Sequence, residues 1–384
     1  MTTGSPPDVL ILGAGPAGAA AAFFAARQGL RVAVLSREVP ASVPPRPEWL
    51  YPESRRLLDE SDLVLKPILL GVIDHVKFTD PAGQRSAAAP LDAAVPVVNS
   101  AALTKRLLEA AIRNNAKLLP ATDITAIENA ENAVVLRTTT GDRLTGRLLI
   151  AADGYDSLAV RSFGLDHPRS MERSCVCCQV IAALPGPRSR PKPAAQNELT
   201  WVLTSDDLSE FGYIYRAGPD LVIGVVTSAS SSAPKDEICG VFSRTVVRWQ
   251  AAEILPPSIE FDPANIGIRP IPRGLALDLD THVAKHSLVT GDAGGFVVAV
   301  SHEGLHPAIT SAMLAANVCA KALKSGYPQD VLAEFDTLWR VALAEFLRLP
   351  NDDLRFLLPL VFTNERIARR LANWLLCAKT ARSV

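Results

Sequence analysis

The chain has 384 residues, 48% hydrophobic and 21% charged, with a formal net charge of −1. That length can bury a large core and form two packed domains, and a charge near zero does not favour nucleic acid as a partner. No segment approaches the roughly 18 uninterrupted apolar residues of a transmembrane helix. The first residues lack the features of a signal peptide, and six cysteines do not make a disulfide framework. We therefore expect a cytoplasmic globular enzyme with no transmembrane segment.

Residues 8–38 have the pattern of a strand, a glycine-rich turn, a helix and a second strand. Apolar runs at 8–12 and 32–35 flank the spacing G-x-G-x-x-G and an alanine-rich helix. The first glycine permits a tight turn, the second lets a pyrophosphate approach the backbone, and the third lets helix and strand pack closely. The helix amino terminus offers N–H groups to phosphates. The pattern predicts a dinucleotide site rather than a plain glycine turn, formed by Gly13, Gly15, Pro16, Ala17 and Gly18.

The end of the second strand departs from this pattern. An acidic residue about 20 positions past the glycines normally bonds the adenosine ribose. Here Ser36 and Arg37 occupy that place. A serine can still bond a ribose hydroxyl, and the arginine can meet adenine or a phosphate, so we expect both at the cofactor.

The pattern changes between residues 98 and 153. Apolar residues recur at helical spacing over 101–114, and three short β-rich runs follow at 124–127, 134–137 and 147–151. This indicates a helix and an antiparallel β-meander inserted into the dinucleotide fold. The last run continues into the segment "IAADGYDSLAVRSFGL".

Three motifs in order carry a family resemblance: the glycine turn, "ADGYDSLAVRSFG" with Asp153, and "GDAGGF" with Gly291 and Asp292. Together they resemble FAD-dependent oxidoreductases of the para-hydroxybenzoate hydroxylase type. The segments "EGLHPAITSAMLAA" and "FGYIYRAGPDLVIGVV" are most similar to the geranylgeranyl reductase branch. The resemblance covers about residues 8–325 and implies FAD as the cofactor.

The resemblance also implies roles for single residues. Asp292 would bind a hydroxyl of the FAD ribityl or ribose chain, the alternative being a turn cap. A helix beginning near Gly304 and Leu305 would direct N–H groups at the flavin N1–C2=O edge. An arginine common at the start of the helix after Val98 is replaced by Ser100, so a pyrophosphate contact would either be lost or be supplied by Arg46.

Only a few residues are candidates for a catalytic role or for the substrate pocket. His302, with Glu303 and His306 nearby, can move a proton near neutral pH, although backbone bonding and helix capping are open alternatives. The "CVCC" run at 175–178 alternates like a core strand, and no second Cys/His cluster at zinc spacing follows, so no metal is expected. Strand residues of the middle segment are candidates for the substrate pocket. They are Cys177, Trp201, Tyr213 and Tyr215.

Two further segments bear on partners. A basic, proline-rich stretch at 184–196 is expected to be a hairpin connection, with a partner contact as the alternative. From residue 331 the pattern is helical and amphipathic, with arginines beside apolar residues. A packed helix pair is the main interpretation, and a peripheral membrane or partner-protein surface is the alternative.

We therefore predict an α/β fold: a Rossmann-type FAD-binding domain with an inserted β-meander, a mixed α+β substrate domain and a helical C-terminal tail. The expected segments are 1–75, 98–165 and 275–330 for FAD, 76–97 and 166–274 for substrate, and 331–384 for the tail. NAD(P)H would bind transiently and reduce the flavin, because no second G-x-G-x-x-G is present. An apolar small molecule would then be hydroxylated with O2 or reduced. A prenyl-chain double-bond reductase and a flavoprotein that modifies a residue of a partner protein remain open alternatives.

Overall fold

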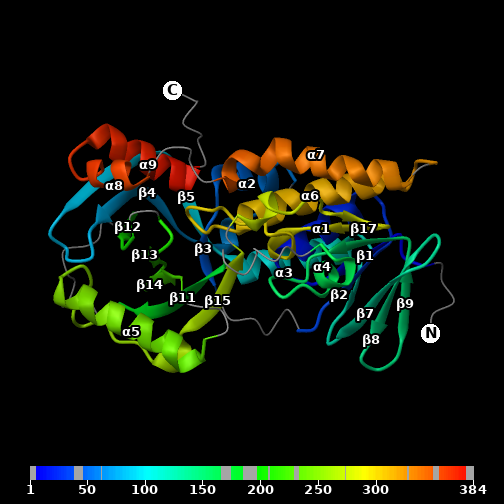
Figure 1. The fold of residues 1–384 in the computed structure, drawn as a ribbon, viewed down its shortest axis with the longest axis horizontal. Coiled ribbons are helices and arrows are strands. Elements are labelled where there is room, and N and C mark those ends of the chain that lie inside the picture. The colour runs from blue at the N-terminus through cyan, green and yellow to red at the C-terminus, as the bar shows by residue number, and fades with distance from the viewer. Residues whose placement is uncertain are drawn as a thin grey trace.

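The computed structural model places two lobes side by side, one around a parallel sheet and one around a larger mixed sheet (Figure 1). The N-terminus lies at the far end of the parallel-sheet lobe, and α7 runs along that lobe (Figure 1). The described residues are 6–38, 46–61, 63–165, 174–184, 197–205, 208–228, 233–272, 274–326, 328–348 and 354–377. Most of the proline-rich stretch at 184–196 therefore lies outside them.

The first lobe contains a six-stranded sheet in the order β16-β17-β10-β1-β2-β6. Its strands are β1 (Val9–Leu12), β2 (Val32–Leu35), β6 (Lys117–Leu119), β10 (Leu148–Ala151), β16 (Val283–Ala284) and β17 (Ser287–Val289). All pairs are parallel except β16 with β17. The central strands are buried over their whole length, because helices cover one face of the sheet and the meander strands at 124–146 cover the other.

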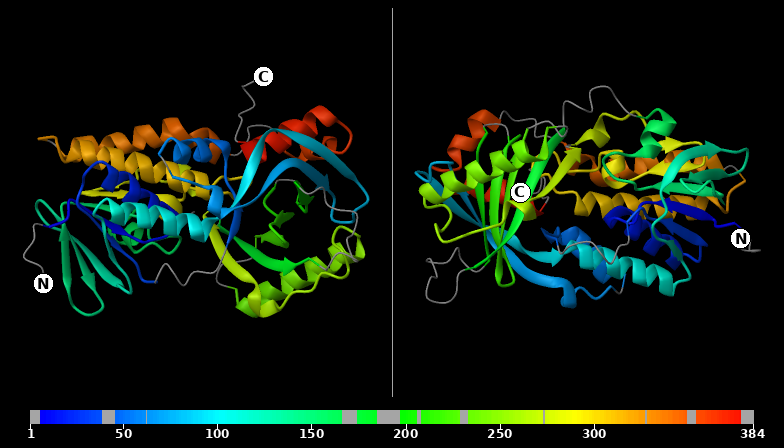
Figure 2. Two further views of the ribbon diagram at one scale, coloured as in Figure 1. Left: turned by 180° about the vertical axis from the view of Figure 1, so that it is seen from behind. Right: turned by 90° about the horizontal axis from the view of Figure 1, so that it is seen from below.

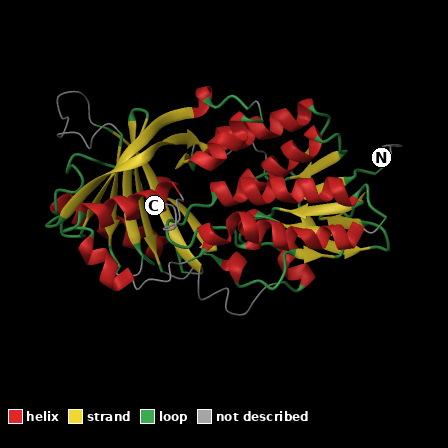
Figure 3. Cartoon of the chain, turned by 90° about the horizontal axis from the view of Figure 1, so that it is seen from above, coloured by secondary structure: helices red, strands yellow, loops and turns green. Residues whose placement is uncertain are grey.

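Helices cover this sheet (Figure 3). Helix α1 (Pro16–Arg27) packs against α3 (Ser100–Arg113) and α6 (Leu305–Ala322), and α7 (Pro328–Leu347) packs on α6. The small residues of α1 allow this close packing, because nearly every position from Ala17 to Ala26 is buried. Two short helices, α2 (Pro52–Asp59) and α4 (Leu158–Phe163), complete the lobe.

The structure contains the predicted β-meander, but its third strand is not the predicted one. It consists of β7 (Ile124–Asn129), β8 (Val134–Thr138) and β9 (Arg143–Gly146). The prediction that the run at 147–151 closes the meander is wrong, because β10 pairs with β1 in the parallel sheet. All four residues of β10 are buried and apolar, which suits a central parallel strand, whereas β9 alternates between exposed and covered positions.

The second lobe contains an eight-stranded sheet in the order β15-β11-β14-β13-β12-β4-β5-β3. The strands are β3 (Pro47–Trp49), β4 (Leu69–Thr79), β5 (Ser86–Asn99), β11 (Ser174–Ala183), β12 (Glu198–Leu203), β13 (Phe211–Ala217), β14 (Asp220–Thr227) and β15 (Gly267–Pro272). Strand β4 crosses the predicted boundary at residues 75 and 76, and β3 belongs to this sheet although it falls within a predicted FAD segment. The "CVCC" run lies in β11, so the predicted core strand is confirmed.

The two faces of the eight-stranded sheet have different covers. Helix α5 (Lys235–Ala251) covers one face and crosses the strands there (Figure 2). The other face carries the aromatic side chains and packs against α8 (Leu354–Leu360) and α9 (Glu365–Cys377). Strand β11 contributes side chains to both faces: Cys175 and Cys177 face the aromatic side, while Val176 and Cys178 face α5.

The helical C-terminal tail is confirmed, and specific bonds hold it on the sheet. The Tyr51 hydroxyl donates to the carbonyl of Leu375 at 2.7 Å, and Arg369 pairs with Asp92 at 2.8 Å. Asn373 accepts the backbone N–H of Asp92 at 2.8 Å. Among the described helices none is long and apolar enough to cross a membrane.

Candidate functional site

The glycine-rich turn has the geometry that its spacing predicts. Gly13 has φ +102°, and a Cβ there would lie 2.2 Å from the carbonyl oxygen of Ala152. A Cβ on Gly18 would lie 1.9 Å from the Gly13 oxygen, so helix and turn touch through these two residues. A Cβ on Gly15 would instead meet nothing within 4 Å. Gly15 also begins α1 without a side-chain cap, leaving the first N–H groups of the helix for a ligand.

This open space continues into a groove at the carboxyl ends of β1 and β10. We call it the cofactor groove; its walls include Gly15, Ala17, Arg46, Ala152, Asp292 and Gly304. A second cavity adjoins it inside the eight-stranded sheet. We call it the aromatic pocket; its walls include Trp49, Cys177, Tyr213, Tyr215, His302 and Glu303. The residues that line both cavities are Glu48, Arg269, Ile271, His302, Gly304 and Leu305.

Asp292 is a largely buried acid at the wall of the groove. It lies in the short helical turn Gly291–Gly294, and its Oδ1 is 3.4 Å from where a Cβ on Gly304 would be. Burial raises the pKa of the Asp292 carboxyl, although Arg269 and Arg46 favour its charged form. A hydroxyl-bearing ligand in the groove would satisfy this carboxylate, which fits the role expected from the resemblance.

Two arginines at the groove converge on one acid. Glu48 pairs with Arg46 at 2.5 Å and with Arg269 at 3.1 Å. Burial raises the pKa of Glu48, but the two guanidinium groups outweigh it and hold the pKa below its ordinary value. Arg46 keeps its place because its carbonyl accepts bonds from the N–H and hydroxyl of Ser100 at 2.8 and 3.0 Å.

Sequence reasoning missed Glu48 and Arg269. The only signal was a charged residue inside each of two short, otherwise mostly apolar strands, "PEW" and "GIRPIP". Ser100, which stands where an arginine is usual, hydrogen-bonds to the backbone of Arg46 and so holds that arginine beside the groove.

The loop before α6 brings His302 and Glu303 to the aromatic pocket. His302 is 5% exposed and adopts φ +54°, which is uncommon for a residue with a side chain. Its Nδ1 contacts Cys175 Sγ at 3.4 Å, and its ring packs at 5.0 Å from that of Phe211. It also lies on the wall of the cofactor groove, so one side chain faces both cavities.

Glu303 takes part in the start of α6. Its Oε1 accepts the backbone N–H of His306 at 2.9 Å, so one N–H group at this helix terminus bonds to the protein itself. Its Oε2 is buried and has no hydrogen-bond partner among the described residues. Burial raises the pKa of Glu303 to about 8.

His306 lies away from both cavities. Its Nδ1 is 2.7 Å from the Ser54 hydroxyl, and its ring stacks on Tyr51 at 5.6 Å. Burial lowers the pKa of His306 to about 4, so the ring is neutral at physiological pH. These contacts indicate a packing role.

The structure brings most of the predicted site residues together. Gly15, Pro16, Ala17, Arg46, Asp292, Gly304 and Leu305 line the groove, with Gly13, Gly18 and Gly291 in its supporting turns. Cys177, Tyr213 and Tyr215 line the aromatic pocket, where the Tyr213 hydroxyl contacts Cys177 Sγ at 3.2 Å.

Besides the three glycines of the supporting turns, four predicted residues lie outside the walls of both cavities. Trp201 is fully buried and stacks on Phe211 at 4.4 Å. Asp153 accepts the Ser157 hydroxyl at 2.6 Å and the Ala159 N–H at 3.2 Å, so its carboxylate bonds to the residues that begin α4. Ser36 donates to the Glu38 carbonyl at 2.6 Å at the end of β2, followed by exposed Arg37. Cofactor contacts of Asp153, Ser36 and Arg37 stay predictions.

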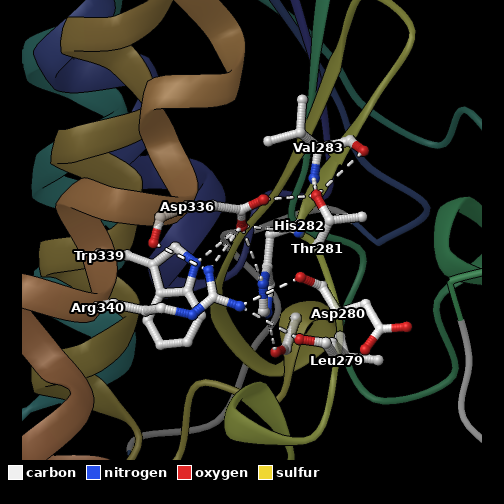
Figure 4. A network of polar contacts seen from close by, with 9 residues as sticks. Leu279, Asp280, Thr281, His282, Val283, Asp336, Trp339 and Arg340 are labelled. Atoms are coloured by element: carbon white, nitrogen blue, oxygen red, sulfur yellow. Dashed lines mark hydrogen bonds and ion pairs between the residues drawn. The ribbon is translucent and has the colours of Figure 1, made fainter.

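A polar network that sequence reasoning missed supports the turn containing Asp292 (Figure 4). The buried His282 donates from Nε2 to the Gly294 carbonyl at 2.8 Å. Asp336 of α7 accepts from the His282 N–H at 2.9 Å and from Trp339 Nε1 at 3.1 Å. The network therefore ties this turn to α7.

The Rossmann-type sheet, the open glycine cradle and the adjoining buried pocket define a flavin-dependent oxidoreductase. The chain belongs to the FAD-binding domain family, whose model matches residues 7–224. The prediction of an FAD-dependent oxidoreductase of the para-hydroxybenzoate hydroxylase type is thereby confirmed, with its α/β fold and its FAD cofactor.

Relatives and solved structures extend the likeness over nearly the whole chain. A digeranylgeranylglycerophospholipid reductase of Methanococcus vannielii is 22% identical over 91% of this chain and 85% of its own. A geranylgeranyl bacteriochlorophyll reductase-like structure from Thermoplasma acidophilum has a TM-score of 0.73 at 17% identity, covering 96% of both chains. PqsL of Pseudomonas aeruginosa, a probable FAD-dependent monooxygenase, has a TM-score of 0.67 at 19% identity, with 96% of this chain and 99% of PqsL covered. The two structural matches bear on the fold alone.

Proposed function

We propose that this oxidoreductase reduces carbon–carbon double bonds of an apolar, prenyl-type substrate, with NAD(P)H as the transient source of electrons. The observation that carries the proposal is the aromatic pocket, which is buried, lies inside the curled eight-stranded sheet and joins the cofactor groove. The relatedness to a digeranylgeranylglycerophospholipid reductase over most of the chain supports it.

The residues at the groove suit FAD. The N–H groups at the start of α1, beside Gly15, would hold the pyrophosphate with Arg46, and Asp292 would accept a hydroxyl of the sugar chain. When bound, FAD supplies hydride chemistry, which the side chains here cannot supply. Release of FAD rather than FMN on denaturation tests this assignment.

The aromatic pocket suits an unsaturated hydrocarbon. The Trp49 ring lies 5.5 Å from Tyr213 and 5.7 Å from Tyr215, and both tyrosine hydroxyls are already bonded, to Gln179 Oε1 and to the Pro47 carbonyl. The rings therefore offer apolar faces rather than free polar groups. Such faces also attract positive charge that develops on a substrate carbon.

Hydroxylation with O2 is the second candidate reaction. A monooxygenase needs a pocket that excludes water, and the burial of Trp49, Tyr213 and Tyr215 satisfies that need as well. One experiment separates the two reactions: the protein is reduced anaerobically with NADH or NADPH and then mixed with a prenyl lipid or with oxygen. A saturated product without oxygen supports the reductase; oxygen-dependent product supports the hydroxylase.

Modification of a partner protein is less favoured. The tyrosines of the aromatic pocket are almost fully buried, with Tyr213 and Tyr215 at 5% and 1% exposure, which disfavours contact with a residue of another protein. We propose a small apolar molecule as the partner instead. The six free cysteines support our proposal of a reducing, cytoplasmic compartment.

A peripheral membrane contact would bring such a substrate to the protein. Helix α8 exposes Phe356 and Leu360, one turn apart, while Arg366 and Arg370 are exposed on the adjoining α9. Apolar side chains beside cations suit the surface of an anionic bilayer. Cosedimentation with phosphatidylglycerol vesicles should detect binding, and it should weaken when Phe356 and Leu360 are both replaced by serine. Equal sedimentation of the double variant would contradict this contact.

A further inference from the structure

Glu303 is a buried acid in which one carboxyl oxygen is hydrogen-bonded and the other is not, among the described residues. Its residue is 6% exposed, its Oε1 accepts the His306 N–H, and its Oε2 has no hydrogen-bond partner among the described residues. The side chain forms part of the wall of the aromatic pocket. Burial of an unpaired polar atom destabilises a fold unless the atom is used by a ligand.

The surroundings of Glu303 do not supply a close cation. Arg269 favours its charged form weakly at a distance, Glu48 opposes it, and the neutral Tyr51 and the His302 and His306 rings are the other titratable groups around it. Burial is the largest influence and raises the pKa of Glu303 to about 8, despite the bond to the helix amino terminus. At neutral pH the carboxyl therefore keeps its proton.

We propose that Glu303 is the catalytic acid that gives a proton to a substrate carbon during double-bond reduction, an assignment that rests on the function proposed above. The O–H bond of Glu303 breaks, the π bond of the alkene breaks, and a C–H bond forms at one carbon. The other alkene carbon takes up a hydride, the chemistry that reduced FAD supplies. A saturated bond and a Glu303 carboxylate remain, and solvent returns the proton.

His302 is the competing donor, and its contacts favour another role. Its Nδ1 faces Cys175 Sγ at 3.4 Å and its ring packs on Phe211, so protein groups hold it on two sides. Glu303 differs because burial raises the pKa of its carboxyl to about 8, so the group already carries a proton near neutrality. We therefore assign proton donation to Glu303 and positioning of the loop to His302.

The test compares Glu303→Gln with Glu53→Gln in the FAD-loaded protein. Glu53 is a matched control, because its Oε2 is also buried without a partner but the residue lies in α2, away from both cavities. Reduction of the flavin by NADPH is measured first, followed anaerobically by the reoxidation rate with digeranylgeranylglycerophospholipid in detergent micelles. General acid catalysis is worth about 10²–10⁴-fold in rate.

We expect Glu303→Gln to keep flavin reduction by NADPH but to slow reoxidation by the lipid at least ~100-fold, with Glu53→Gln unchanged. Glu303→Asp should restore part of the rate. An independent readout uses the protein without substrate: the infrared band of a protonated carboxyl should persist at pH 7, vanish as the pH rises through about 8, and be absent in Glu303→Gln. A normal reoxidation rate in Glu303→Gln, or no such band in the wild type, overturns the assignment.

Failure of the proposed function has a different signature. If the wild-type protein leaves the lipid unsaturated although its flavin is reduced, the reductase function is wrong and the assignment of Glu303 with it. If Glu303→Gln does not fold, the pH dependence of the wild-type lipid step decides the matter. That rate must fall above a pH of about 8, because only the protonated carboxyl donates; a rate that rises there contradicts the proposal.

Discussion

Arg269 donates to Glu48 across 3.1 Å, and this bond joins β15 to β3, the two edge strands of the eight-stranded sheet. The sheet therefore curls until its edges meet, as seen from behind in Figure 2. Trp49, beside Glu48 on β3, consequently contacts Tyr213 and Tyr215 of the central strand β13. The aromatic pocket lies inside this curl, and the pair of charges forms its boundary with the cofactor groove.

Glu48→Gln should lower the free energy of unfolding by about 1–2 kcal/mol. The change removes the charged partner of two arginines. Both guanidinium groups are partly exposed, so water replaces part of the lost interaction and the decrease in stability stays moderate. Urea denaturation of the FAD-free protein measures this. The control is Glu128→Gln, which breaks an exposed pair with Arg137 and should change the stability less than Glu48→Gln does, because solvent screens the pair. Equal effects would mean that closure of the sheet does not depend on Glu48.

Gly15→Val and Gly18→Val should fail in different ways. A Cβ on Gly15 points into open space, so Gly15→Val should fold with a near-normal melting temperature but lose FAD binding. A Cβ on Gly18 would lie 1.9 Å from a backbone oxygen, so Gly18→Val should be strongly destabilised. Thermal melting and FAD titration of both variants check this. If Gly15→Val binds FAD with wild-type affinity, the pyrophosphate does not lie beside Gly15.

Asp292→Ala should weaken FAD binding by about 1.5–3 kcal/mol, through loss of a charge-assisted hydrogen bond. The FAD-free variant should melt no lower than the wild type. The reason is that burial raises the pKa of Asp292, so its charge at neutral pH opposes folding. Calorimetry with FAD and melting without it measure the two effects. A lowered melting point with unchanged affinity would make Asp292 a turn cap, as the alternative interpretation holds.

His302→Ala should leave FAD binding nearly intact while changing the rates of flavin reduction or reoxidation, since His302 faces both cavities. The φ of +54° suggests His302→Asn as the companion variant, because asparagine tolerates this conformation best after glycine. Stopped-flow kinetics and melting on the same samples separate chemistry from packing. Unchanged kinetics in His302→Ala with a lower melting point would assign the residue to structure alone.

Asp336→Asn should destabilise the protein at neutral pH but not in acid. Burial raises the pKa of Asp336, but bonds from His282, Thr281 and Trp339 outweigh it and hold the pKa well below its usual value. The folded-state pKa is depressed, so this stabilisation is fully present above about pH 4 and disappears as the pH falls through the folded-state pKa. Melting curves of wild type and variant should therefore converge toward low pH. A difference that stays constant with pH would show that charge is not the cause.

Local patterns predicted the elements that depend on neighbouring residues. The glycine turn, the start of α6 after Gly304 and the helical tail are encoded by spacing, capping and periodicity within short segments. The wrong assignment of β10 has the same origin, because Leu148–Ala151 is apolar and β-rich in either sheet. Only its pairing with β1, distant in sequence, decides its place.

Residues close together in the chain were enough to predict the class of protein. The glycine spacing indicates a dinucleotide cradle built from consecutive residues, and the three ordered motifs resemble FAD-dependent oxidoreductases. Which side chains line the two cavities depends instead on contacts between residues far apart in the chain. Glu48 and Arg269 are 221 residues apart and meet only because the sheet curls. Trp201 and Tyr213 are aromatic partners on paired strands, yet one is buried under Phe211 and the other faces the pocket. Glu303 keeps its proton because of burial, a property that long-range packing confers and no local pattern encodes.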